Sequence, residues 1–87
     1  MEKIDIDTRW LQDFVVLGET LSFSESAKIR MISQAAFSRR ISSLEHNLEV
    51  LLIDRSTKPI QLTPEGQTFL LIAQQALEQL DHFKNKE

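Results

Sequence analysis

The stretch SQAAFSRRISSLEHNL, residues 33–48, predicts a helix with two different faces. Its large apolar residues recur at steps of 4, 3 and 4, which is the spacing of one buried helix face. These residues are Phe37, Ile41, Leu44 and Leu48. Ser33 precedes them and is placed to cap the helix with its hydroxyl. We therefore expect one face to pack in a core, while the small, polar and basic opposite face stays available to a partner.

A second, shorter helix is expected directly before this one. SFSE, residues 22–25, matches the capping box, in which the side chains of Ser22 and Glu25 each accept a backbone N–H that would otherwise be unpaired. The helix that follows should end at about Arg30, two or three residues before Ser33. Two helices joined by so short a turn cross steeply, which is the helix-turn-helix arrangement.

Elements on both sides complete a small domain. Thr8 is the expected N-cap of a first helix, and the apolar positions of that helix are Trp10, Phe14, Leu17 and Leu21. VLLID (50–54) and IQL (60–62) are β-prone runs separated by RSTKP, which suits a turn. The expected fold class is mainly α: a winged helix-turn-helix with a two-stranded β wing and a long C-terminal linker helix.

The last helix is long for a domain of this size. Thr63 is its expected N-cap and Pro64 its first residue, where the missing N–H of proline costs nothing. We expect residues 1–63 to form the winged domain and residues 64–87 a linker helix that pairs with a second copy of the chain. The predicted dimer contacts are Phe69, Ala73, Ala76, Leu77, Leu80 and Phe83. The alternative is that this seam packs entirely on its own domain.

Composition argues against several kinds of site. The 87 residues include no cysteine, which excludes disulfides and thiolate chemistry. His46 and His82 are far apart and lack partners at metal-ligand spacing, so neither a metal nor another cofactor is expected. The longest apolar run, FLLIA (69–73), is far too short to span a membrane, and the acidic N-terminus has no apolar signal region. We expect a cytoplasmic protein.

The charge is unevenly distributed along the chain. The net charge is −3, yet residues 28–58 contain six Lys and Arg against three Asp and Glu. A basic segment of this kind is expected where a polyanion such as double-stranded DNA docks.

The polar face of the 33–48 helix fits a DNA major groove. Short side chains let the helix backbone approach the bases, while Gln34 and Arg39 are of types that make bidentate contacts to base edges. Hydroxyls and N-terminal amides of a helix bind phosphate. Arg40 lies about 100° around the helix from Arg39 and is therefore assigned to phosphate or solvent. A merely solvated polar face is the alternative.

Basic residues also flank the turn of the expected wing. Arg55 and Lys58 are placed to reach phosphate or an adjacent minor groove, although charged residues are common in turns. The predicted DNA-binding residues are Ser33, Gln34, Ala35, Ser38, Arg39, Arg40, Arg55 and Lys58.

An enzyme is not indicated. Ser42 and Ser43 stand at helical spacing from His46, but no carboxylate is placed to orient the imidazole and there is no oxyanion-hole loop. Gly18 and Gly66 are the two glycines, so the sequence has no Gly-rich phosphate loop.

Several motifs in register connect the chain to a known family. SQxxxSRxI (33–41), LE (44–45), LxxR (52–55) and KPIQLTPEG (58–66) follow one another without insertion. In these motifs the chain resembles the N-terminal winged helix-turn-helix domain of LysR-type transcriptional regulators. The resemblance implies a recognition helix, a wing and a dimerising linker helix. It places DNA contacts on Ser33, Gln34, Ala35, Ser38, Arg39, Arg55 and Lys58.

Four positions depart from the family pattern. Ala35 replaces a proline, Arg30 a buried leucine, Glu49 a glycine before the wing and Ile53 a phenylalanine. We expect Arg30 to extend its head group to solvent or to phosphate, and Glu49 to indicate an altered turn. Ile53 is interpreted as a change of volume in the core.

The resemblance also implies what kind of full-length protein contains this domain. Within the family, FSRRI (37–41) and Trp10 are similar to hypochlorite-responsive members. Family members are normally longer, with an effector-sensing domain after the linker helix. This sequence stops at HFKNKE (82–87), so we expect the DNA-binding part of a longer protein, with the effector-binding domain absent and its effector unknown.

Two functions fit a winged helix-turn-helix with a polar, basic helix face. We predict sequence-specific DNA binding by a homodimer, with the recognition helix 33–47 in the major groove and tetramers conceivable in a full-length protein. The alternative is a winged-helix module that dimerises through the linker helix and binds protein without reading DNA.

Overall fold

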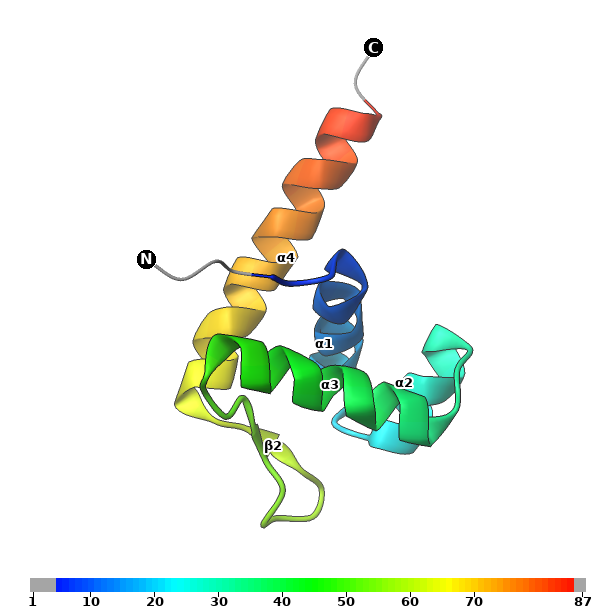
Figure 1. Cartoon of the computed structure of the whole chain (residues 1–87), viewed down its shortest axis with the longest axis vertical. Helices are drawn as coiled ribbons and strands as arrows, with labels where there is room; N and C mark the ends of the chain where they lie inside the picture. Colours follow the sequence, from blue (N-terminus) through cyan, green and yellow to red (C-terminus); the bar gives the residue numbers. More distant parts are fainter. Residues whose placement is uncertain (1–4, 86–87) are drawn as a thin grey trace.

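Residues 5–85, which the computed structural model describes, form four helices and a two-stranded wing (Figure 1). The helices are α1 (Thr8–Thr20), α2 (Phe23–Arg30), α3 (Gln34–Leu48) and α4 (Pro64–Lys84), and the strands are β1 (Ile53–Asp54) and β2 (Gln61–Leu62). The predicted mainly α winged helix-turn-helix is confirmed. Residues 1–4 of the expected winged domain and residues 86–87 of the expected linker helix lie outside the described residues.

Three of the predicted helix caps are present. The Ser22 hydroxyl accepts the N–H of Glu25 at 3.1 Å, and the Ser33 hydroxyl accepts that of Ala36 at 3.1 Å. Thr63 caps α4 in the same way, with Pro64 as the first helical residue. Each cap satisfies one of the backbone donors that a helix N-terminus leaves unpaired. The starts of α2, α3 and α4 are therefore set by local sequence.

Two details of capping differ from the prediction. Thr8 is already helical, and Asp7 caps α1 by accepting the N–H of Arg9 at 2.8 Å. The Asp7 carboxylate replaces the predicted Thr8 hydroxyl as the cap because it also pairs with the Arg9 side chain at 2.7 Å. This pairing lowers the pKa of Asp7 to about 2. The second half of the capping box is absent at Ser22, whose N–H donates to the Thr20 hydroxyl instead of the Glu25 carboxylate.

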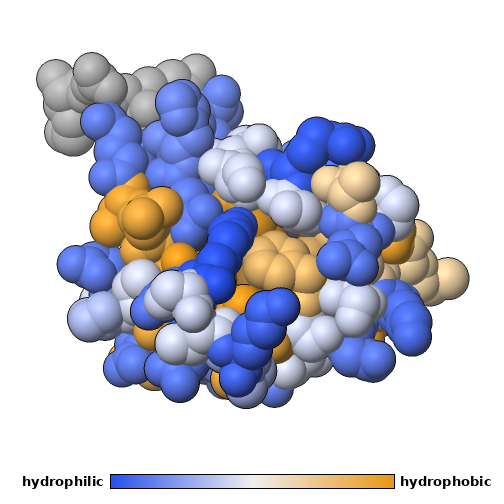
Figure 2. All heavy atoms as spheres, turned by 90° about the horizontal axis from the view of Figure 1, so that it is seen from below, coloured by the Kyte–Doolittle hydropathy of each residue, from blue (hydrophilic) through white to orange (hydrophobic). Residues whose placement is uncertain are grey.

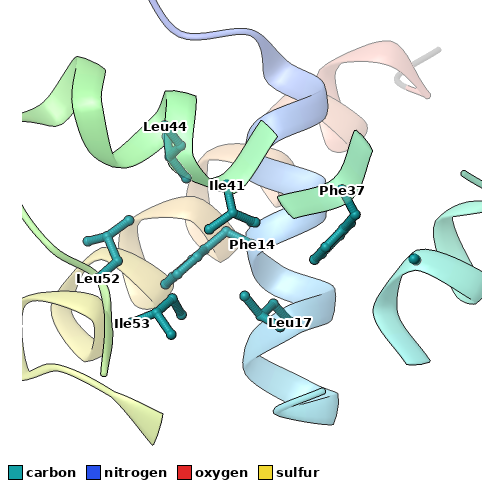
Figure 3. Close-up of a cluster of buried hydrophobic side chains, with 8 residues drawn as sticks. Phe14, Leu17, Phe37, Ile41, Leu44, Leu52 and Ile53 are labelled. Atoms are coloured by element: carbon teal, nitrogen blue, oxygen red, sulfur yellow. The ribbon is translucent and has the colours of Figure 1, made fainter. Parts of the chain in front are cut away.

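The core lies where α1, α3 and the wing meet (Figure 3). Its largest fully buried apolar side chains are Phe14, Phe37, Leu17, Ile41, Leu44 and Leu52, and Ile53 is 3% exposed. The apolar periodicity predicted five of these positions in α1 and α3. Burying each such side chain stabilises the fold by about 1.5–3 kcal/mol before entropy is counted. These contacts fix which face of α3 turns inward.

The turn between α2 and α3 is as short as expected. Met31 ends α2 in the left-handed conformation, with φ at 62°, and its N–H bonds back to the carbonyls of the last helical turn. Phe23 of α2 packs edge-on against Phe37 of α3, with 5.9 Å between ring centroids. The predicted helix-turn-helix is therefore confirmed.

The wing is shorter than the two β-prone runs suggested. Ile53 pairs with Leu62 and Asp54 with Gln61, in antiparallel register. The segment 50–52 does not extend β1, because its backbone groups bond elsewhere: the N–H of Val50 donates to the carbonyl of Glu45. At the tip, the Asp54 carboxylate accepts the backbone N–H of Ser56, and the Lys58–Pro59 peptide bond is cis.

α4 begins inside the domain and leaves it (Figure 1). A Cβ at Gly66 would lie 2.1 Å from the carbonyl oxygen of Leu52, so only glycine fits at this close approach without moving the backbone. Phe69 packs edge-on against Phe14, with 5.7 Å between ring centroids, and Ala73 is fully buried. The assignment of Ala73 to a dimer interface is therefore wrong, because none of its surface is exposed to a partner.

Glu49 keeps the left-handed conformation that is typical of glycine at a helix end, so the altered turn expected from the sequence is not seen. It ends α3 in the left-handed conformation, with φ at 57°, where a Cβ is unfavourable. That conformation costs a residue with a Cβ about 1–2 kcal/mol, and glycine avoids this cost. Glycine loses more conformational entropy on folding, worth about 0.5–1 kcal/mol, so Glu49→Gly should raise the free energy of unfolding by about 1 kcal/mol. Urea denaturation at fixed protein concentration measures this change in the free energy of unfolding. Glu49→Ala, which removes the charge but keeps the Cβ, should show no comparable gain; an equal gain would attribute the effect to charge.

Candidate nucleic-acid interface

One face of α3 is turned away from the core. Phe37, Ile41 and Leu44 point inward (Figure 3), so the side chains between them face outward. The outward positions that the sequence assigned to DNA are exposed at Ser33, Gln34, Ala35 and Arg39, and half-buried at Ser38. Within residues 5–85, Arg39 forms no ion pair. The structure thus brings the predicted recognition residues together on one accessible face.

The N-terminal end of α3 is arranged to bind an anion. The Ser33 oxygen accepts the N–H of Ala36, but its own O–H is left to donate. Helix N-termini carry partial positive charge and unpaired N–H groups, which favour phosphate. Seen from the side on which the wing projects, hydrophilic side chains form most of the surface and border smaller apolar areas (Figure 2).

Arg40 does not point to phosphate or solvent as predicted. Its Nε donates to Oδ2 of Asp13 and its Nη2 donates to Oδ1, both at 2.7 Å. These hydrogen bonds raise the pKa of Arg40 above its usual value, so the guanidinium is always charged. Its side chain is 23% exposed, whereas that of Asp13 is fully buried. We therefore remove Arg40 from the DNA-binding residues.

Arg30 shares the same partner. Its Nε donates to Oδ1 of Asp13 at 2.7 Å and its Nη2 donates to Gln12 at 3.1 Å. The expectation that Arg30 reaches solvent or phosphate is therefore wrong. The arginine that replaces the family's leucine is a second counter-charge for a carboxylate inside the domain.

Sequence reasoning missed Asp13, although a signal was present. Asp13 lies three residues after Trp10 and four before Leu17, so it falls within the apolar stripe of α1. A carboxylate at such a position is buried only when cations or N–H groups pair with it. The two arginines supply that pairing, and they tie α1 to α2 and α3.

The wing is attached to α3 through another carboxylate. The Glu45 side chain is 9% exposed, and its Oε2 accepts the backbone N–H groups of Leu52 at 2.8 Å and Ile53 at 3.1 Å. Arg55 approaches Glu45 at 3.8 Å and lies 5.0 Å from the centroid of the Phe23 ring. Arg55 therefore connects the wing to α2 and α3, with 42% of its side chain still exposed. Lys58 is exposed and has no ion pair within the described part of the chain.

A continuous apolar stripe runs along the projecting part of α4. Ile72, Leu80 and Phe83 are 53%, 55% and 78% exposed, and Ala76 is half-buried between them. Their spacing of 4, 4 and 3 places all four on one helix face. Leu77 lies on another side, half-buried. The exposed stripe therefore differs from the predicted seam in two ways. It includes Ile72, and it leaves out Leu77 and the core residues Phe69 and Ala73.

The other candidate sites have no supporting geometry. Ser42, Ser43 and His46 are exposed on α3, and no hydrogen bond among residues 5–85 joins a hydroxyl to the imidazole. Residues 5–85 include no group of three His, Cys, Asp or Glu placed to hold a metal ion. None of the helices α1 to α4 is long and apolar enough to cross a membrane.

A family profile described as "Bacterial regulatory helix-turn-helix protein, lysR family" matches residues 8–67. The chain belongs to this LysR family. The match covers α1 to the start of α4, so it includes the recognition helix, the wing and the Gly66 contact. The resemblance inferred from the spaced motifs is therefore confirmed.

Individual relatives agree with this assignment. The chain is 42% identical over 77 residues to the HTH-type transcriptional regulator YjiE of Escherichia coli K12, covering 88% of this chain and 25% of that protein. It superposes on Vibrio fischeri DarR, solved in complex with DNA, with TM-score 0.92 and 39% identity, covering 94% of this chain and 28% of that one. Full-length HypT of Salmonella typhimurium, a hypochlorite-specific regulator, gives TM-score 0.88 and 41% identity, with coverages of 94% and 28%. The chain spans about a quarter of the length of these relatives.

Glu45 provides the prediction for this site. Glu45→Gln keeps the shape but replaces a charged acceptor of two backbone N–H groups, so it should lower the free energy of unfolding by about 1–2 kcal/mol. Hydrogen exchange of the backbone N–H groups of Leu52 and Ile53 should become faster in the same variant. Glu49→Gln, an exposed neutralisation at the end of the same helix, is the control. If both variants unfold at the same urea concentration as the unaltered chain, Glu45 does not hold the wing.

Proposed function

We propose that the chain is a sequence-specific DNA-binding domain of a LysR-family transcriptional regulator, with α3 in the major groove. The observation that carries the proposal is the exposed face of α3, where Gln34 and Arg39 stand among short side chains. The superposition on DarR, which was solved with DNA, supports it. A regulator of this kind acts on DNA in the cytoplasm.

The proposed contacts follow from the chemistry of each position. The major groove is about 12 Å wide and admits a helix whose outward side chains are short, as Ala35 and Ser38 are. In that position Arg39 would pair with the acceptors of guanine and Gln34 with adenine. Ser33 and the first amides of α3 would bind phosphate, which fixes register without reading sequence.

The wing supplies the remaining contacts in this proposal. Lys58 has no competing partner among the described residues, so it is the side chain we assign to phosphate or the minor groove. Arg55 is shared between Glu45 and Phe23, and we propose that it contributes to DNA through its exposed part only.

We further propose a homodimer formed through α4. Ile72, Ala76, Leu80 and Phe83 offer a stripe that a second copy can cover when two α4 helices pair. Two-fold symmetry would present two α3 helices to half-sites about one DNA turn apart. In this view residues 1–63 are the DNA-binding domain and residues 64–87 the dimerisation helix, although the first turns of that helix also complete the core.

Arg39 tests base reading. Arg39→Ala should weaken binding to the preferred duplex by about 1–3 kcal/mol and relax base preference at one position. Fluorescence anisotropy with duplexes that differ at single positions measures both effects. Lys84→Ala, which removes one cation at the far end of α4, should change neither. An equal loss on every sequence would assign Arg39 to phosphate.

Leu80 tests the dimer. Leu80→Glu places a charge from each copy in the proposed interface and should raise the dimer dissociation constant at least about 10-fold, because burying even one uncharged polar group without a partner costs roughly 1–3 kcal/mol. Sedimentation equilibrium measures the constant. Gln79→Glu adds the same charge to the neighbouring exposed position and should leave it unchanged. If Leu80→Glu sediments as the unaltered chain does, this stripe is not the interface.

A further inference from the structure

Three arginines lie on the helix-turn-helix, and two of them share one partner inside the domain. Arg39 has no ion pair within residues 5–85, whereas Arg30 and Arg40 both bind the buried carboxylate of Asp13. We propose that Asp13 is a specificity-determining residue that withholds Arg30 and Arg40 from the DNA backbone. Arg39 is then the one arginine that α3 offers to DNA. This inference rests on the proposed function of α3 as a DNA reader.

The geometry of the cluster accounts for the withholding. Both Asp13 oxygens accept a hydrogen bond from Arg40 at 2.7 Å, a bidentate arrangement that is stronger than a single contact. Arg30 adds a third bond at 2.7 Å, and its Nη2 donates to Gln12. No buried polar side-chain atom among the described residues lacks a partner. The cluster is therefore satisfied without any contribution from DNA.

Burial makes the cluster difficult to open. The Asp13 side chain is fully buried, while those of the two arginines are 23% exposed. A buried charge that loses its partners is strongly unfavourable. A phosphate that drew Arg40 toward DNA would leave Asp13 undercompensated. Arg40 is thus held inside although it neighbours Arg39 in sequence.

Withholding cations raises sequence specificity. Contacts to phosphate strengthen binding to every DNA sequence, and each one adds about 0.9 to the slope of log affinity against log salt. Two further arginines at the groove would stabilise correct and incorrect sequences alike. The bidentate bond to Asp13 adds to the apolar contacts of α3 that already set its rotation, and Arg39 faces outward, about 100° away from Arg40.

Salt-dependent binding to two duplexes tests the proposal. One duplex carries the sequence that the chain selects from a randomised pool, and the other is an unrelated duplex of equal length, both titrated between 50 and 200 mM salt. Asp13→Asn frees both arginines and should steepen the slope on the unrelated duplex by about 1–2 for each bound protomer, which adds roughly a 4- to 16-fold affinity loss per protomer across this range. The ratio of specific to unrelated affinity should fall. Asp81→Asn, with the same charge change on α4, should leave the slope and the ratio unchanged.

A folded Asp13→Asn variant with an unchanged slope would overturn the proposal. If that variant does not fold, an apolar replacement of the whole cluster, Asp13→Leu with Arg30→Leu and Arg40→Met, provides the test. Its slope on both duplexes should equal that of the unaltered chain, because neither arginine contacts DNA. A slope shallower by about one or more would show that these arginines bind phosphate. If the unaltered chain itself prefers no sequence, the proposed function fails, and this inference fails with it.

Discussion

A carboxylate without access to water lies where the three helices of the domain meet. Asp13 of α1 is bound by Arg30 of α2 and by Arg40 of α3, with three hydrogen bonds of 2.7 Å. Unlike apolar contacts, which tolerate small rotations, a bidentate bond to a buried carboxylate has one favourable geometry. Together with the buried apolar face of α3, the cluster therefore sets the orientation of the helix, and with it the outward direction of Arg39.

The wing is positioned by the same kind of interaction. Glu45, on the inner side of α3, accepts the backbone N–H groups of Leu52 and Ile53, so the helix that carries the proposed DNA-binding face also holds the start of β1. Arg55 adds contacts to Glu45 and to Phe23. Polar side chains of α3 thus have two roles. Those that face inward fix the geometry of the domain, and those that face outward are available to DNA.

The sequence predicted the elements better than the directions of long side chains. Apolar periodicity and caps such as Ser33 are local, and they placed α2 and α3 correctly. Whether Arg40 turns outward or back depends on Asp13, which is 27 residues away, and no rule about α3 alone contains that information. The α4 seam was predicted incompletely for a similar reason. Ala73 and Ile72 are adjacent and apolar, and only the position of α1 decides that Ala73 is covered while Ile72 is exposed.

Selection from a randomised duplex pool decides whether α3 reads DNA sequence. The chain is incubated with the pool at two salt concentrations, and the bound fraction is sequenced. If a dimer reads base edges with α3, we expect an enriched, two-fold symmetric sequence. Its half-sites should be about one helical turn apart, and the enrichment should persist at the higher salt. Binding that disappears with added salt and enriches no sequence would reduce the interaction to phosphate attraction. In that case α3 does not read sequence, and a winged-helix module that binds protein is favoured.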